Sequence, residues 1–153
     1  EGEMTDAVAI YDAIFAQADS TIAQRLRKES VMWAVARISV GQSAKAIDHL
    51  EAVLRDRTRI YGATHLRTAE ARGLIGAVRV HLGNDNDAAR DFRSSVPALL
   101  DAPDGTVRTF ILEAYLAFLS SRASITDDRK VRTAVAAFQI ANGLRSSKVN
   151  KAL

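Results

Sequence analysis

Apolar residues recur three and four positions apart along almost the whole chain, and no strand-like alternation lasts beyond a few residues. This spacing gathers the apolar side chains on one face of a helix, and it therefore predicts an all-α protein. Short polar breaks divide the pattern into about seven expected helices, at roughly 4–18, 21–40, 43–60, 65–82, 86–101, 105–121 and 128–151. Because the connections are short, successive helices should lie antiparallel.

Residue types that favour helix ends stand at these breaks. Small polar residues that can cap a helix N-terminus precede the expected helices: Asp19 or Ser20, Ser43, Thr64, Asp85 or Asp87, Asp104, and Thr126 or Asp127. Gly62 and Gly83 lie where a helix C-cap is expected, because glycine adopts the left-handed conformation found there.

The helices repeat one another. Four of them carry an alanine followed four residues later by a large apolar residue: Ala7/Tyr11, Ala46/Leu50, Ala88/Phe92 and Ala134/Phe138. The alanines are 39, 42 and 46 residues apart (46 − 7, 88 − 46, 134 − 88). The intervening helices align too, since Trp33-Ala34 matches Ile75-Gly76, with Leu116-Ala117 continuing the series.

Helix pairs that alternate large and small residues at a fixed offset predict a right-handed α-solenoid, in which stacking buries faces that one pair cannot bury alone. We expect one domain over residues 1–153. It should contain a leading half repeat (4–18) and three repeats (21–60, 65–101 and 105–151).

This pattern resembles the tetratricopeptide repeat, which places Leu-Gly in the first helix of a pair and Ala-x-x-x-Phe in the second. Here the corresponding residues are Ile75-Gly76 with Ala88 and Phe92. The period of 42 and the stretch IYGATHLRTA resemble the kinesin-light-chain type, although Leu66 stands where that type has proline. The resemblance implies a protein-binding scaffold whose first helices line a concave groove.

The C-terminal stretch AVAAFQIANGLRSSKVNKAL (134–153) resembles the segment that closes the repeat array in bacterial caspase-like CHAT proteins. That resemblance implies an array that regulates an attached peptidase domain. Because the chain starts at Glu1 without an initiator methionine, we expect a piece of a longer multidomain protein. The alternative is the sensor or oligomerisation arm of a bacterial signalling or transcription regulator.

Composition excludes several classes of site. There is no cysteine, so thiol nucleophiles and thiolate metal sites are excluded, and no apolar run approaches the ~20 residues that span a bilayer. The basic segment 129–153 holds one aromatic residue, Phe138, so nucleic-acid binding is not favoured. We expect a cytoplasmic protein, and the oligomeric state stays open.

The candidate chemistry is sparse. His49, His65 and His81 are 16 residues apart, with His65 at the joint and the other two within helices, and they lack the spacing of a metal site. We therefore predict no catalytic residue, no bound metal and no cofactor, with His65 belonging to the joint between two helices.

The partner-binding candidates are expected on the groove helices. Arg37 and Arg79 occupy the same repeat position, where a guanidinium group could hold a partner carboxylate or form an internal ion pair, for instance with Glu70 or Asp87. Val31 and Val35 stand where chaperone-tail clamps carry lysine and asparagine, so a clamp of that kind is not expected. The predicted groove residues are Arg37, Arg79, Arg72, His81, Val31 and Val35.

Overall fold

The periodic segments of the sequence form helices in the computed structural model, which describes residues 2–17, 21 and 30–122. These residues contain six helices and no strand, which confirms the all-α prediction. The helices are α1 (Gly2–Gln17), α3 (Met32–Ser39), α4 (Ser43–Tyr61), α5 (Leu66–His81), α6 (Asp85–Leu100) and α7 (Thr106–Arg122). The expected helix at 128–151 lies outside the described residues.

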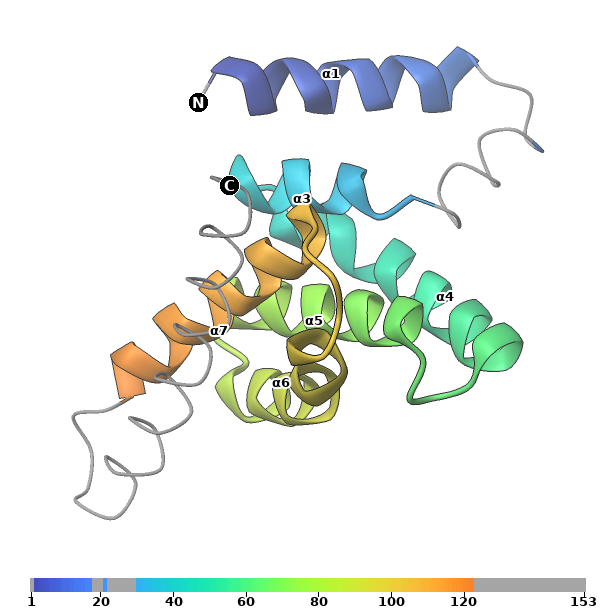
Figure 1. The fold of residues 1–153 in the computed structure, drawn as a ribbon. Helices are drawn as coiled ribbons and strands as arrows, with labels where there is room; N and C mark the ends of the chain where they lie inside the picture. Colours follow the sequence, from blue (N-terminus) through green and yellow to red (C-terminus); the bar gives the residue numbers. More distant parts are fainter. Residues whose placement is uncertain (1, 18–20, 22–29, 123–153) are drawn as a thin grey trace, which may run out of the picture.

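The helices stack in pairs, as a helical solenoid requires. In the repeat alignment of the sequence, α3, α5 and α7 correspond to first helices, and α1, α4 and α6 correspond to second helices. Helix α5 packs against both α4 and α6, while α1 packs on α3 (Figure 1). Helix α7 begins near α3 and crosses α5, so the three first helices contact one another.

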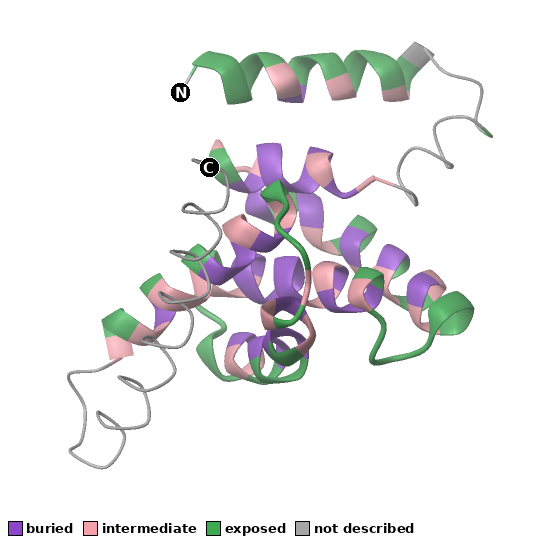
Figure 2. Cartoon of the chain, in the orientation of Figure 1, coloured by how far each residue is buried: buried purple, intermediate pink, exposed green. Residues whose placement is uncertain are grey.

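Small residues let the helices approach, and large residues fill the space above them. A Cβ atom at Gly76 would lie 3.1 Å from the ring of Phe92, and one at Gly73 would lie 2.6 Å from Cγ2 of Ile111. The repeated alanines Ala46 and Ala88 are completely buried, as are Leu50 and Phe92. Buried residues accordingly concentrate on α3 to α6, whereas α1 is largely exposed (Figure 2).

Two glycines one repeat apart end the first helices in the same way. Gly41 and Gly83 have φ angles of 76° and 75°. At the first, the N–H of Gln42 donates to the carbonyl of Arg37 (2.8 Å), and at the second the N–H of Asn84 donates to the carbonyl of Arg79 (2.8 Å). These are Schellman motifs, which satisfy carbonyls at the end of a helix.

The predicted N-caps at three helices are wrong. Ser43 is the first residue of α4 and follows Gln42, and Asn84 precedes α6 in place of Asp85 or Asp87. At α5 the N-cap is His65 and not Thr64. The His65 Nδ1 atom accepts a hydrogen bond from the N–H of Arg67 (3.1 Å), so a ring nitrogen performs the capping that a hydroxyl oxygen usually performs.

Helix α3 is shorter than the expected helix 21–40. It begins at Met32 after the non-helical residues 30 and 31, and it ends at Ser39. The second half of the expected repeat 105–151 lies outside the described part of the chain. In the part that is described, no helix is long and apolar enough to cross a membrane.

Candidate functional site

The predicted groove residues do not gather in one groove. Val35 is buried in α3, and Val31 is buried at the N-cap position before that helix. Val35 lines a cavity beside α7, whereas Arg37 lines a different cavity beside α1 and α4. His81 is exposed, and its Nδ1 atom lies 3.0 Å from Oγ of Ser43.

Both repeated arginines form internal ion pairs with second helices. Arg37 pairs with Asp12 of α1 and donates a hydrogen bond to Oε1 of Gln42 (2.8 Å). Arg79 lies 2.7 Å from Oδ2 of Asp91 on α6 and 3.2 Å from Oε1 of Glu51 on α4. Arg79 therefore reaches the second helices on both sides of α5, whereas Arg37 reaches only α1 and the residue that precedes α4.

The carboxylates suggested by the sequence have other partners. Glu70 lies 3.4 Å from Arg57, and Asp87 lies 3.1 Å from Arg90. The suggestion that either residue pairs with Arg79 is therefore wrong, because Glu51 and Asp91 occupy its guanidinium group.

Asp91 is the most buried carboxylate in the described part of the chain. Burial raises the pKa of Asp91 above its ordinary value of 3.8, because desolvation disfavours the charged form. The positive charges of Arg79 and, more weakly, Arg72 act in the opposite direction. Arg72 thus contributes to the electrostatic surroundings of the Arg79 ion pair.

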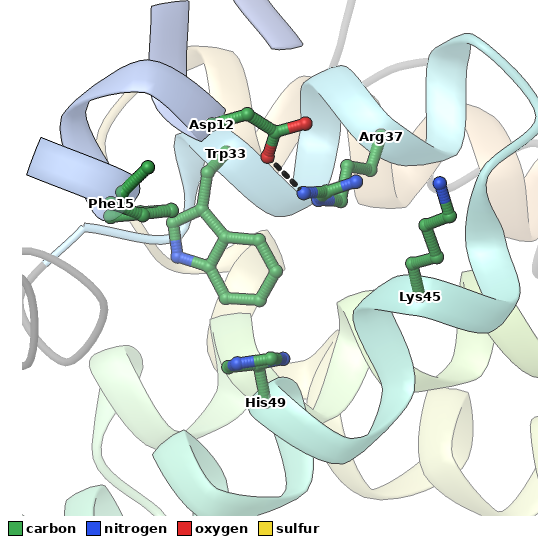
Figure 3. A pocket seen from close by; sticks show the side chains of 7 residues that line it. Asp12, Phe15, Trp33, Arg37, Lys45 and His49 are labelled. Atoms are coloured by element: carbon green, nitrogen blue, oxygen red, sulfur yellow. Dashed lines mark hydrogen bonds and ion pairs between the residues drawn. The ribbon is translucent and has the colours of Figure 1, made fainter. Parts of the chain in front are cut away.

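A cavity of about 340 Å³ opens beside Arg37, between α1, α3 and α4. Its walls are formed by Asp12, Phe15, Ala16, Trp33, Arg37, Lys45 and His49 (Figure 3). The ring of His49 meets the indole of Trp33 edge-on, with the ring centroids 5.7 Å apart. We call this the Arg37 cavity. It combines aromatic walls with several nitrogen-bearing side chains.

A second cavity, of about 320 Å³, lies between α1, α3 and α7. Its lining residues are Met4, Val35, Ser39, Gly105, Thr106, Thr109, Phe110 and Glu113. We call this the first-helix cavity, because two of the three helices that form it are first helices. Its surface is apolar with hydroxyl groups, and it includes one carboxylate and no basic side chain.

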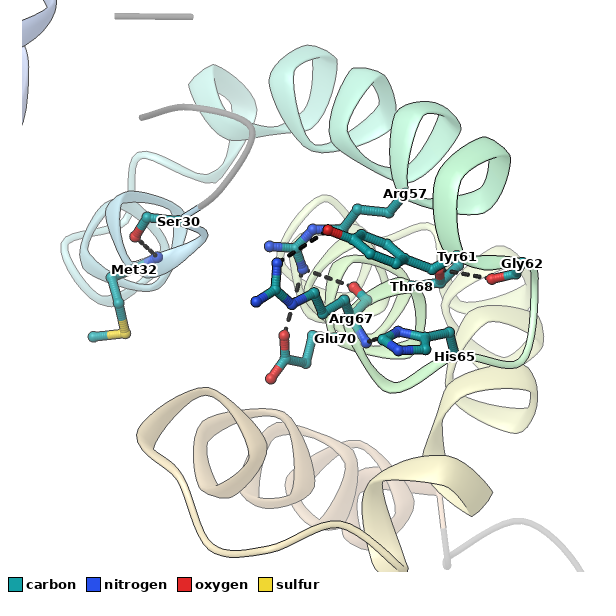
Figure 4. A network of polar contacts seen from close by, with 9 residues as sticks. All are labelled: Ser30, Met32, Arg57, Tyr61, Gly62, His65, Arg67, Thr68 and Glu70. Carbon is teal, nitrogen blue, oxygen red and sulfur yellow. Dashed lines mark hydrogen bonds and ion pairs between the residues drawn. The ribbon is translucent and has the colours of Figure 1, made fainter. Parts of the chain in front are cut away.

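The joint between α4 and α5 is held by a network around Tyr61 (Figure 4). The rings of Tyr61 and His65 stack with their centroids 4.8 Å apart. The guanidinium group of Arg67 lies 5.4 Å from the Tyr61 ring centroid and donates to its hydroxyl oxygen (3.1 Å). Tyr61, His65 and Arg67 therefore fix one another.

Buried groups continue this network beneath the surface. Arg57 donates to the carbonyl of Arg67 (2.7 Å), and the hydroxyl of Thr68 donates to the carbonyl of Gly62 (2.8 Å). Desolvation lowers the pKa of Arg57, while nearby Glu70 opposes that effect. These bonds tie the carbonyl of Gly62 at the turn and that of Arg67 in the first turn of α5 to buried side chains, so they brace the joint between α4 and α5.

The three histidines lie in separate places. His49 contacts Trp33, His65 stacks on Tyr61, and His81 lies beside Ser43. Among the described residues, no group of three or more histidine, aspartate or glutamate side chains could hold a metal ion.

Lys45 and Asp12 are not among the residues expected from the sequence, and His49 is considered only as a possible metal ligand. The repeat alignment contained a usable signal for two of them. Lys45 and His49 align with Asp87 and Asp91, which lie 42 residues later, so the residue charge reverses at one position and is altered at the other.

The comparisons with known proteins agree with this architecture. A family model for the tetratricopeptide repeat matches residues 24–101, which cover α3 to α6. No curated protein matches the chain, and no solved structure matches it. Since the matched segment is about half of the sequence, the chain belongs to the tetratricopeptide repeat family.

Proposed function

We propose that this domain is a protein-interaction scaffold that binds an extended or helical segment of a partner at the first-helix cavity. Family membership supports a scaffold in general. We choose this surface because a cavity of about 320 Å³ lies there, between α1, α3 and α7. Val35 lines this cavity, as a groove position should, whereas Arg79 is occupied by two internal carboxylates.

The lining suggests what the partner presents. Met4 and Phe110 offer apolar surface. The Ser39 hydroxyl donates to the carbonyl of Val35 (2.9 Å), so its oxygen can accept a hydrogen bond from a peptide backbone, as can the hydroxyl oxygen of Thr109. An apolar anchor side chain of the partner fits this chemistry, since buried anchors in a pocket supply most of the binding energy at protein interfaces.

Bulky substitutions at the cavity test this proposal. Ser39 is exposed and Thr109 is half-buried, so Ser39→Arg together with Thr109→Arg should fill the cavity without opening the core. Capture from a lysate of the source organism is compared by mass spectrometry for the original protein and this variant. Ser94→Arg, on the exposed surface of α6, is the matched control.

Partners that depend on the cavity should be lost from the double variant and retained by the Ser94→Arg control. An identical set of partners from all three proteins would contradict the proposed surface.

We further propose that the array regulates an attached CHAT-type caspase-like peptidase in a bacterial multidomain protein. This part is supported by the sequence of 134–153 alone, which lies outside the described residues. A histidine and a cysteine in a downstream α/β domain, together with altered peptidase activity in the Ser39→Arg, Thr109→Arg variant, would bear it out. In this proposal the repeat domain itself catalyses no reaction, and the location is cytoplasmic.

An alternative is that the domain is the sensor or oligomerisation arm of a bacterial signalling or transcription regulator. The exposed apolar side chains of α1 favour it, because Ile10 and Ile14 are 59% and 38% exposed. Sedimentation equilibrium tests this alternative. A stable dimer that Ile10→Glu with Ile14→Glu dissociates would support it, and a monomer at all concentrations would exclude oligomerisation.

A further inference from the structure

The two described repeats hold their arginines in the same framework. Arg37 and Arg79 are 42 residues apart, and each pairs with a carboxylate of the preceding second helix. Those carboxylates, Asp12 and Glu51, are themselves equivalent, because they follow the repeated alanines Ala7 and Ala46 by five residues. The ion pair between the arginine and the preceding second helix is therefore common to both repeats.

The contact between the arginine and the following second helix differs between the two repeats. In the later repeat, Asp91 of α6 places Oδ2 2.7 Å from Nη1 of Arg79. The equivalent residue on α4 is His49, whose ring packs against Trp33 instead. Nη1 of Arg37 donates to the neutral side chain of Gln42. The earlier repeat thus lacks the carboxylate that its own second helix would supply.

The Arg37 cavity lies where this carboxylate is missing. Arg37, Lys45 and His49 line it, and Asp12 is its one acidic residue. Lys45 stands where the later repeat has Asp87, and no carboxylate within the described residues forms an ion pair with it. The cavity therefore has an excess of positive charge beside the aromatic walls of Phe15 and Trp33.

We propose that the Arg37 cavity binds the side-chain carboxylate of an aspartate or glutamate in a partner protein. The carboxylate takes the position at Arg37 that Asp91 takes at Arg79, within reach of Lys45. A large apolar residue next to it in the partner packs on the half-buried ring of Phe15, close to the buried indole of Trp33. This inference depends on the proposed protein-binding function but assigns a second site, formed by second helices α1 and α4 around α3.

The first test uses fluorescence, because Trp33 is the single tryptophan of the chain and forms a wall of the cavity. The probe is the acetylated and amidated peptide Gly-Phe-Glu-Phe-Gly. It should change the Trp33 emission in a saturable way. The same peptide with Gln in place of Glu should bind at least about tenfold more weakly, because it loses the charge-assisted hydrogen bonds.

An acetylated Gly-Phe-Gly-Phe-Gly peptide with a free C-terminus separates the two sources of a carboxylate. Binding of this peptide as tight as that of the Glu peptide would overturn the assignment to an acidic side chain. Absence of a saturable response to the Glu peptide, or equal affinity for the Glu and Gln peptides, would overturn the site itself.

Variants then test the position of the carboxylate. His49→Asp supplies internally what Asp91 supplies in the later repeat, so affinity for the Glu peptide should fall at least about tenfold. His49→Asn is the uncharged control and should retain binding. Lys45→Glu, at an exposed position on α4, should also weaken binding. It provides a second test in case His49→Asp fails to fold.

The variants also separate this site from the proposed first-helix surface. Ser39→Arg with Thr109→Arg should leave the peptide response unchanged. Unchanged peptide affinity in both His49→Asp and Lys45→Glu would overturn the Arg37 site, while loss of partner capture in the Ser39, Thr109 variant would still support the proposed function.

Discussion

Asp91 and His49 occupy the same position in successive repeats, and of the two only Asp91 binds the arginine of its own repeat. The later repeat thereby closes an internal ion-pair network, whereas the earlier repeat has a cavity lined by Arg37, Lys45 and His49. One repeat position thus has a structural role in one copy and is available for binding in the other.

The two arginines should differ in their contribution to stability. Arg79→Met leaves the buried carboxylate of Asp91 without its partner, which should lower the free energy of unfolding by about 1–3 kcal/mol. Arg37→Met removes the partner of the exposed Asp12 and the donor to the neutral Gln42 side chain, and the cost should be about 0–1 kcal/mol. Urea denaturation of both variants measures the difference, and equal losses would contradict the proposed inequality.

Asp91 should make stability depend on pH. Its pKa is raised in the folded protein, so the folded state binds more protons than the unfolded state above the ordinary value of 3.8. The stability that protonation of Asp91 contributes is fully present below pH 3.8 and is lost as the pH rises through the pKa of Asp91 in the folded protein.

Asp91→Asn removes this titration. The original protein should therefore lose stability relative to the variant as the pH rises from about 4 towards neutrality. Urea denaturation at several pH values provides the comparison. If the original protein instead becomes more stable than the variant as the pH rises over that interval, the predicted direction of the pH dependence is wrong.

Gly73 should not tolerate a methyl group. An alanine Cβ atom would lie 2.6 Å from Cγ2 of Ile111, a branch that cannot swing away as a flexible chain end would. Gly73→Ala should therefore destabilise the protein by about 1–3 kcal/mol, even though alanine favours helix.

Gly105→Ala is the matched control, since nothing lies within 4 Å of its added Cβ atom. Its effect should stay within about 0.5 kcal/mol. Thermal or urea unfolding that finds the two substitutions equally harmful would rule out crowding between α5 and α7 as the cause.

The capping role of His65 is also testable. His65→Ala removes the acceptor of the Arg67 N–H and the ring that stacks on Tyr61, so the free energy of unfolding should fall by about 1 kcal/mol. Thr64→Ala should have little effect, because His65 occupies the cap. If chemical denaturation shows that Thr64→Ala lowers the free energy of unfolding more than His65→Ala does, Thr64 and not His65 caps the helix.

Much of the helical framework could be predicted from local spacing. The pattern of small and large residues identified the Gly76 and Phe92 contact positions, because a stacked repeat can bury its apolar face in only a few ways. The N-caps were harder to predict. Several polar residues crowd each break, and the choice of His65 depends on its stacking with Tyr61 as well as on capping preference.

The repeated position of Arg37 and Arg79 was visible in the sequence, whereas their partners were not. Glu51 and Asp91 lie 28 and 12 residues from Arg79 in the chain, and helix packing brings them to it. Cavities also cannot be read from residue types, because the Arg37 cavity depends on the relative placement of three helices.

The most direct test of the difference between the repeats is an NMR titration of protein labelled with ¹⁵N-arginine. The side-chain Nε–Hε resonances of Arg37 and Arg79 are assigned from the two Arg→Met variants and followed while the Glu-containing peptide is added. The Arg37 resonance should shift to saturation while the Arg79 resonance stays in place, because Asp91 and Glu51 already hold Arg79. An unchanged Arg37 resonance at saturating peptide would contradict the account.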